Sequence, residues 1–289
     1  MIIYLKLFLT AAFWGGTFIA GKILAENVGP FSASFLRFLT ASLCLLLITW
    51  KIEGRFPGIR NKQIFPLILL GLTGVFSYNL FFFKGLRLID AGRASIIIAN
   101  NPIFIALLSM LLFKERITLL KFVGVLISVT GAVIAISRGD LNNIMTGGLG
   151  FGEFFIFCCV ASWVCYSLIG KAVMTDLSPL VSVTYSAIIG TACLFIPALF
   201  EGILSDMKYY MTSEWISIFY LGFFGTVLGF VWYYEGIKKI GPTRAGLFIN
   251  FVPITAIILA FLILKEPLTL SLFVGALFVC SGVYLTNRP

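Results

Sequence analysis

Ten stretches of about twenty apolar residues follow one another along the chain, and they constrain the fold more than any other feature. A helix needs about 20 such residues to cross the ~30 Å hydrocarbon core of a bilayer. The stretches cover residues 3–25, 30–50, 64–88, 91–113, 119–137, 149–172, 179–200, 214–238, 243–264 and 269–286. Strands of a transmembrane barrel would instead alternate over about ten residues. The sequence therefore predicts an all-α integral membrane protein with ten transmembrane helices.

Composition supports this class and excludes others. Hydrophobic residues make up 60% of the chain and charged residues 11%, against about 25% charged residues in soluble domains. The net charge of +9 comes from short Lys and Arg clusters between apolar runs. A nucleic-acid binder gathers its basic residues on one solvated face, so no nucleic-acid partner is expected. The first apolar stretch is longer than the core of a signal peptide and is expected to be a permanent span.

The residues available for metal binding are few. The chain has no His, and each of its six Cys lies inside an apolar stretch. Buried, reduced Cys residues behave as small apolar side chains. The sequence therefore predicts no metal site and no cofactor.

The distribution of positive charge predicts the orientation of the chain. Cytoplasmic loops of membrane proteins carry an excess of Lys and Arg. With ten spans both termini lie on one side, whose loops hold thirteen of the 21 basic residues, against seven on the other side. Both termini are therefore expected in the cytoplasm.

The chain contains an internal duplication, in which residues 1–140 and 141–289 form two repeats of five spans each. A shift of 151 places Arg93-Ala94 on Arg244-Ala245, Pro102 on Pro253, and Lys114-Glu115 on Lys265-Glu266; a shift of 149 places Trp14 on Trp163 and Pro30 on Pro179. Because five is odd, the second repeat must enter the membrane inverted. Inverted repeats are typical of secondary transporters, whose substrate sites lie near the midplane between the repeats.

These repeats carry the resemblance to a known family. The segments AAFWGGTFIAGKIL, LRLIDAGRASIIIANNPIFIALLSMLLFKERIT and IKKIGPTRAGLFINFVPITAIILAFLILKEPLT resemble the EamA family of the drug/metabolite transporter superfamily, over nearly the whole chain. The resemblance implies a ten-helix carrier in the bacterial inner membrane. Most such carriers export amino acids and other metabolites, and some take up or exchange small solutes.

Several features are candidates for a substrate site. Pro102 and Pro253 lie within spans and remove backbone donors, so they predict kinks or openings near the midplane. Polar and aromatic side chains near these levels are the cavity candidates: Trp14, Tyr78, Asn79, Asn101, Trp163, Tyr166, Trp232, Tyr233 and Asn250. A buried indole or phenol prefers a hydrogen-bond partner, which a substrate could supply. Packing kinks and aromatic core packing are the alternatives, and Tyr233 could instead be an interfacial anchor.

Two charges, Arg37 and Glu153, lie within spans, one or two turns below the outer surface. A charge at that depth costs several kcal/mol, roughly 2.5–3.5 for Arg at a helix centre, so each is expected to face protein or water. Three interpretations are open: the two residues pair, Arg37 meets a substrate carboxylate, or both reach the interface. Arg37 has only Ser186 at the equivalent repeat position.

The sequence favours a transporter over other membrane proteins. It contains no His, no HExxH or GxSxG motif and no paired carboxylates within the spans, so it is not expected to be an enzyme. An exporter of amino acids or related metabolites is the favoured function. The alternatives are an uptake or exchange carrier for nucleoside-like or amine metabolites, and a lipid translocator. Besides its solute, the lipid bilayer is the expected partner of a monomer or weak dimer.

Overall fold

The fold is helical throughout the residues that can be placed. The computed structural model describes residues 2–54, 58–101, 103–105, 107–108, 119–137 and 150–286, and every regular element in these ranges is a helix. The elements of the first part of the chain are α1 (Ile2–Asn27), α2 (Pro30–Glu53), α3 (Asn61–Leu70), η1 (Gly71–Ser77), α4 (Tyr78–Leu88), α5 (Ala91–Ile98) and α7 (Leu119–Ser137). Of these, α3, η1 and α4 form one continuous helical segment.

The second part of the chain follows the same pattern. Its elements are α9 (Phe151–Val173), α10 (Pro179–Phe200), α11 (Ile203–Asp206), η2 (Met207–Tyr209), α12 (Thr212–Tyr220), η3 (Leu221–Leu228), α13 (Gly229–Gly246), η4 (Leu247–Asn250), α14 (Phe251–Leu259), η5 (Ala260–Leu264) and α15 (Leu270–Thr286). Gly241 interrupts α13 with φ 84°, a value that favours Gly, so the helical axis breaks there.

Seven helical segments of the described chain are long and apolar enough to cross a membrane. They cover residues 2–27, 30–53, 61–88, 151–173, 179–200, 212–241 and 244–264. Two shorter apolar helices, 122–137 and 270–285, lie within the predicted fifth and tenth spans. The predicted fourth span, 91–113, lies only partly within the described residues. The chain is thus a multi-pass membrane protein.

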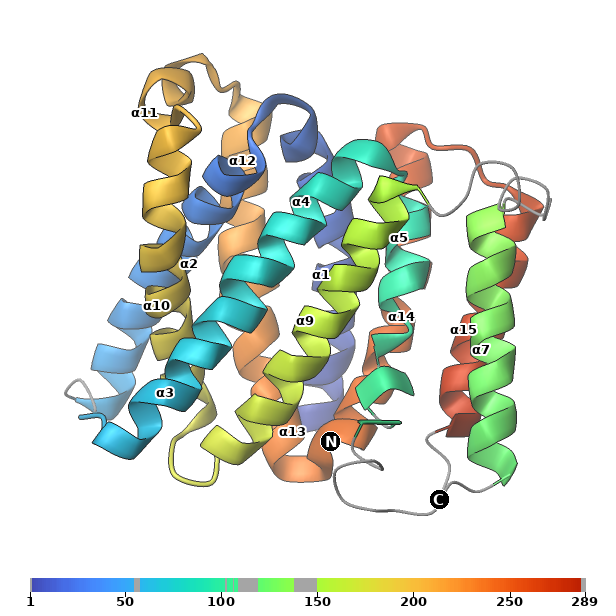
Figure 1. The fold of residues 1–289 in the computed structure, drawn as a ribbon, viewed down its shortest axis with the longest axis horizontal. Helices are drawn as coiled ribbons and strands as arrows, with labels where there is room; N and C mark the ends of the chain where they lie inside the picture. The colour runs from blue at the N-terminus through green and yellow to red at the C-terminus, as the bar shows by residue number, and fades with distance from the viewer. Residues whose placement is uncertain are drawn as a thin grey trace.

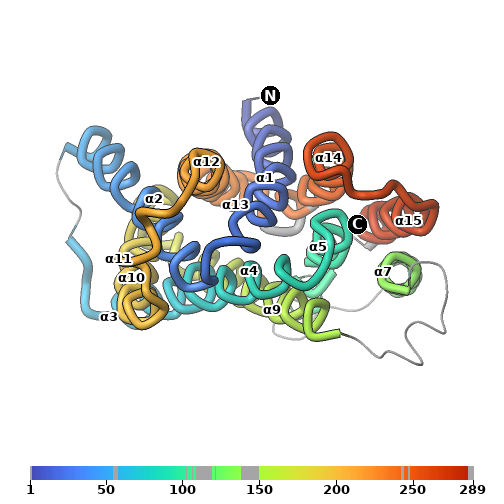
Figure 2. The backbone as a smooth tube through the Cα atoms, turned by 90° about the horizontal axis from the view of Figure 1, so that it is seen from above, coloured from blue at the N-terminus to red at the C-terminus, as the bar shows by residue number. Residues whose placement is uncertain are grey.

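The helices form a bundle in which α1 has a central position (Figures 1 and 2). It packs against α4, α12, α13 and α14. In both views α2, α3 and α10 stand at one edge of the bundle and α7 and α15 at the other. α1 begins and α15 ends at the lower end of Figure 1. We call this the terminal end, and the other the distal end.

Small residues bring α7 and α15 together. A Cβ on Gly131 would lie 2.7 Å from the carbonyl oxygen of Gly275, and a Cβ on Gly282 would overlap the backbone of Gly124 and Ser128. Helices in membranes gain stability from such close approach, because lipid supplies little hydrophobic drive for association. These two helices pack extensively on each other, and a small apolar core that includes Ile96 and Val279 joins them to the bundle.

Three π-helical segments occur in the described chain, and two of them, η1 and η3, interrupt long helical segments. A π turn shifts the backbone register and frees carbonyl groups, and it occurs often at functional sites. Side chains donate hydrogen bonds to the freed carbonyl groups: Asn79 Nδ2 donates to the carbonyl of Val75 at 2.8 Å, and Thr226 Oγ1 donates to that of Leu221 at 3.0 Å. The π segments therefore fix the positions of Asn79 and Thr226 deep in the bundle, where both are fully buried.

Candidate functional site

A small cavity of about 30 Å³ lies at the centre of the bundle. Its lining comes from α1, α2, α4, α5, α9, α13, η4 and α14, and from Asn101 beyond the end of α5. The lining residues are Trp14, Thr17, Phe18, Arg37, Tyr78, Phe82, Ile98, Asn101, Trp163, Phe230, Ile249 and Val252. One ordered water needs about 10–15 Å³ of such space, so the cavity has room for about two.

Arg37 brings a positive charge to the cavity. Only 2% of its surface is exposed. Its Nε donates to Thr226 Oγ1 at 3.1 Å and its Nη1 to Asn79 Oδ1 at 2.7 Å. Both acceptors are neutral, and a guanidinium has five N–H donors. Among the described residues no carboxylate neutralises this charge, and three donors have no hydrogen-bond partner.

Aromatic rings form most of the cavity wall. Trp14 and Trp163 meet edge to face, with ring centroids 5.3 Å apart, and Phe230 packs against both. The Trp14 indole donates to the carbonyl of Gly225 at 2.9 Å, which is a group of the π segment η3. The Trp163 indole, in contrast, makes no well-formed hydrogen bond, although the Tyr233 hydroxyl lies close to it. The repeat-related residues Trp14 and Trp163 therefore differ in the hydrogen bonding of their indole N–H groups.

Six buried side-chain atoms of the described chain have no hydrogen-bond partner. They are Thr10 Oγ1, Asn101 Oδ1, Trp163 Nε1, Ser167 Oγ, Tyr233 OH and Asn250 Oδ1. Trp163 and Asn101 line the cavity, and the ring of Tyr233 packs on Trp14 and Trp163. A buried polar group without a partner costs about 1–3 kcal/mol. Such groups around a cavity indicate that water or a solute supplies their partners.

Replacing Tyr233 with Phe tests this interpretation. The Tyr233 hydroxyl lies close to Ser167 and to the Trp163 indole but makes no well-formed hydrogen bond to either. The change removes this hydroxyl and keeps the ring, so we expect Tyr233→Phe to leave the unfolding temperature of the purified protein near that of the wild type and to lower transport. Thermal unfolding in detergent and flux in proteoliposomes measure the two effects. Tyr234→Phe is the matched control, because the Tyr234 hydroxyl donates to the carbonyl of Tyr166 at 3.2 Å. A Tyr233→Phe protein that transports at the wild-type rate would contradict the interpretation.

The structure brings together only some of the predicted site residues. Trp14, Tyr78, Asn101 and Trp163 line the cavity, together with Arg37. Asn79 supports Arg37, and Tyr233 packs on the two Trp rings that line the cavity.

Other predicted site residues lie elsewhere. Tyr166 lies behind the cavity wall: its ring packs on Trp163 and Phe230, with centroids 5.3 and 5.7 Å away, and stacks on Tyr234. Trp232 lies under the ammonium of Lys6, 5.7 Å from its ring centroid. Asn250 lines a separate, largely apolar groove beside α14 and α15.

Of the two predicted proline kinks, only the one at Pro253 lies within the described residues. Pro253 is the third residue of α14 and follows the 3-10 segment η4, so the helix changes its winding just before it. Pro102 lies outside the described residues.

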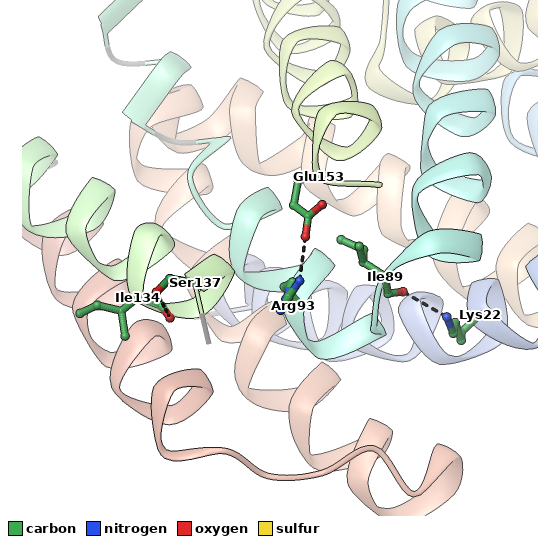
Figure 3. A network of polar contacts seen from close by, with 6 residues as sticks. All are labelled: Lys22, Ile89, Arg93, Ile134, Ser137 and Glu153. Carbon is green, nitrogen blue, oxygen red and sulfur yellow. Dashed lines mark hydrogen bonds and ion pairs between the residues drawn. The ribbon is translucent and has the colours of Figure 1, made fainter. Parts of the chain in front are cut away.

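The suggested pairing of Arg37 with Glu153 is wrong. Glu153 lies in the first turn of α9 and accepts a hydrogen bond from Arg93 Nη1 at 2.7 Å (Figure 3). Helix packing places the N-terminal turns of α5 and α9 together at the distal end. Arg37 instead donates to two neutral side chains beside the cavity, Asn79 and Thr226.

Some residues at the site were missed by the sequence analysis. Thr226 holds Arg37, and Phe230 is the repeat counterpart of Asn79 at a shift of 151. That correspondence could have identified Phe230. Thr17 and Ser167 are small polar residues within apolar helices, and nothing in their local sequence separates them from packing residues.

Polar contacts join the two parts of the chain at both ends of the bundle. At the distal end Glu201 accepts from the backbone of Ser32 at 2.6 Å, and Glu266 accepts from that of Ala91 at 2.8 Å. At the terminal end Lys6 pairs with Glu235 at 2.7 Å. These contacts flank the central cavity on both sides.

A helical membrane bundle with a small, largely aromatic central cavity is an arrangement that a membrane transporter can use. The sequence model of the EamA-like transporter family matches residues 1–137 and again 150–288, and the chain belongs to this family. It is a transporter and not an enzyme.

Curated relatives agree with this assignment. The chain is 30% identical to the uncharacterized transporter YyaM of Bacillus subtilis, over 97% of this chain and 92% of that protein. An uncharacterized transporter of Archaeoglobus fulgidus is 29% identical, over 99% and 98% of the two chains. The WAT1-related protein At3g02690 of Arabidopsis thaliana is 26% identical, over 96% of this chain and 67% of that protein. A solved crystal structure has the same fold, with a TM-score of 0.69 at 19% identity over 99% of this chain and 97% of that chain.

Proposed function

We propose that this protein is a secondary transporter that exports amino acids or related small metabolites across the bacterial inner membrane by alternating access. The observation that carries the proposal is the central cavity, in which a buried guanidinium without a carboxylate partner faces aromatic rings. Transporters of this kind bind their solutes near the midplane, between two repeats. Both termini lie in the cytoplasm in this arrangement.

The proposal includes ten transmembrane helices in two inverted repeats, residues 1–140 and 141–289. Element positions support it: a shift of 151 carries Gly71–Ser77 onto 222–228, which is within η3, and Asn61, the start of α3, onto Thr212, the start of α12. A shift of 149 carries Pro30, the start of α2, onto Pro179, the start of α10. The same family pattern also matches the two parts separately.

Alternating access requires contacts that close one end while the other opens. The distal contacts of Glu201 and Glu266 and the terminal contact between Lys6 and Glu235 all join one proposed repeat to the other. Opening toward the cytoplasm would break the Lys6–Glu235 pair and leave the distal contacts in place. Opening outward would do the reverse.

The charge of the cavity favours some of the candidate solutes. Its lining contains Arg37 and no acidic residue among the described side chains. An amine would meet a like charge there without a carboxylate to offset it. A solute that carries a carboxylate is favoured, and this supports amino acids over the alternative of amine metabolites.

Counterflow in proteoliposomes tests the function. We expect saturable exchange of one or more labelled amino acids, measured at equal and unequal pH across the membrane. Trp163→Leu should abolish the flux, because Trp163 lines the cavity. The control Trp50→Leu should preserve it, because 65% of Trp50 is exposed at the surface of the bundle. Absence of flux for the whole panel in the wild-type protein would overturn the amino-acid assignment.

A further inference from the structure

We infer that the cavity recognises 2-amino and 2-hydroxy carboxylic acids through three polar points: Arg37, Trp163 and Asn101. The inference rests on the proposed function and specifies the substrate class of its site. Each of the three side chains lines the cavity, is at most 4% exposed and has at least one polar atom without a partner. No other cavity-lining side chain combines these properties within the described residues.

The first two points are donors for a carboxylate. Arg37 retains three N–H groups after its bonds to Asn79 and Thr226. The Trp163 indole N–H makes no well-formed hydrogen bond, and the neutral Tyr233 hydroxyl close to it is a weaker acceptor than a carboxylate. A guanidinium binds carboxylates through parallel N–H···O bonds, which are stronger than bonds between neutral groups. The carboxylate of the solute would then neutralise the buried charge of Arg37, for which the described residues supply no carboxylate.

The π segments prepare Arg37 for this role. Asn79 and Thr226 each satisfy a π-segment carbonyl and also accept a hydrogen bond from Arg37. Each of them is therefore held from two sides, and together they hold the guanidinium at two of its three nitrogens. The remaining donors keep a defined direction without a second charge beside them. Such preorganisation lowers the entropy lost on binding.

The third point is an acceptor for the group on carbon 2. Asn101 Oδ1 is buried and has no donor. An ammonium or a hydroxyl next to a carboxylate can donate to such an oxygen, and the faces of the Trp14 and Trp163 rings are favourable neighbours for an ammonium. A solute with only a carboxylate would leave Asn101 unpaired, and an amine would leave Arg37 and Trp163 unpaired.

The solute's side chain would lie among the aromatic rings. It needs more room than the present 30 Å³, so binding must separate the cavity walls. Alternating access provides such separation, and the ligand stabilises the wider conformation because it binds that one better.

Four compounds with the same ring separate the carboxylate contacts of Arg37 and Trp163 from the contact of Asn101: phenylalanine, 3-phenyllactate, 3-phenylpropionate and phenethylamine. Their competition against tritiated phenylalanine is measured on the purified protein in detergent. We expect phenylalanine and 3-phenyllactate to bind at least ten-fold more tightly than 3-phenylpropionate, and phenethylamine not to compete.

Variants assign each effect to its residue. Arg37→Gln should weaken binding of all three carboxylates at least ten-fold, and Arg37→Lys should lie between Arg37→Gln and the wild type. Asn101→Leu should leave 3-phenylpropionate unchanged and remove the advantage of phenylalanine over it. A purely structural role of Asn101 would weaken both compounds equally.

The results that overturn the inference are distinct from those that overturn the transport function. Equal affinity for phenethylamine and phenylalanine, or unchanged carboxylate binding in Arg37→Gln, rejects the three-point site. Failure of phenylalanine to bind rejects it as well. Binding as expected without flux in proteoliposomes keeps the site and rejects transport. Flux of amino acids that is unaltered in Arg37→Gln keeps transport and rejects the site.

Discussion

A Gly282→Leu protein is expected to fail to form a stable bundle. Gly282 lies where α15 packs on α7, and a Cβ there would overlap the backbone nitrogen of Ser128 and the carbonyl oxygen of Gly124. Overpacking a core usually costs about 1–3 kcal/mol when side chains can move. Here backbone atoms are in the way, so the two helices must separate along their whole contact. Size-exclusion chromatography in detergent, with thermal unfolding of any monodisperse fraction, measures the effect.

The control for this variant is Gly58→Leu. Gly58 has open space around it, with no atom within 4 Å of an added Cβ. Its substitution should leave the elution profile and the unfolding temperature unchanged. Ser128→Gly should not rescue Gly282→Leu, because the overlap involves backbone and not only the Ser128 side chain. A monodisperse Gly282→Leu protein with wild-type stability would show that α7 and α15 do not pack in this way.

Glu153→Ala is expected to destabilise the protein by about 3–5 kcal/mol, the usual cost of removing one partner of a buried ion pair. The Arg93 and Glu153 side chains are only 12% and 7% exposed and meet at 2.7 Å. Removing the carboxylate leaves the Arg93 guanidinium buried without its counter-charge. Arg93→Met together with Glu153→Leu should recover most of the loss, because two apolar side chains need no partner. Thermal or denaturant unfolding in detergent measures all three proteins.

An exposed ion pair provides the control. Lys62 and Asp176 meet at 2.8 Å at the surface, and Lys62 is 64% exposed. Exposed pairs contribute little to stability, so Lys62→Met should change it far less than Glu153→Ala. If the double variant at positions 93 and 153 were as unstable as Glu153→Ala, the pair would not be the source of the loss.

The duplicated sequence pattern predicted where the helices begin. Pro30 and Pro179 were matched by the repeat, and each is the first residue of its helix, α2 and α10. Pro favours this position because its missing N–H is not needed there. Signals of this kind are local, since they depend on one residue and its neighbours in the chain, so they can be read without knowledge of packing.

The residues that line the cavity could be predicted only in part. Trp14 and Trp163 were identified because they match in the repeat, and both line it. Tyr166 and Trp232 were included for their type and their level in the spans; Tyr166 packs behind the Trp163 and Phe230 rings without lining the cavity, and Trp232 lies against Lys6. In a helix that is apolar all round, the sequence has no polar face to indicate which side meets the protein interior.

The sequence by itself determined the membrane class, the helical segments, the duplicated pattern and the resemblance to the EamA family, because these depend on composition and spacing along the chain. Only the tertiary structure decided the partners of the two intramembrane charges. Arg37 meets Asn79 and Thr226 because π turns in η1 and η3 shift the helical register at those points. Glu153 meets Arg93 because α9 packs against α5. Which side chains meet across helices depends on rotation and register, and these are set by close packing between segments far apart in the sequence.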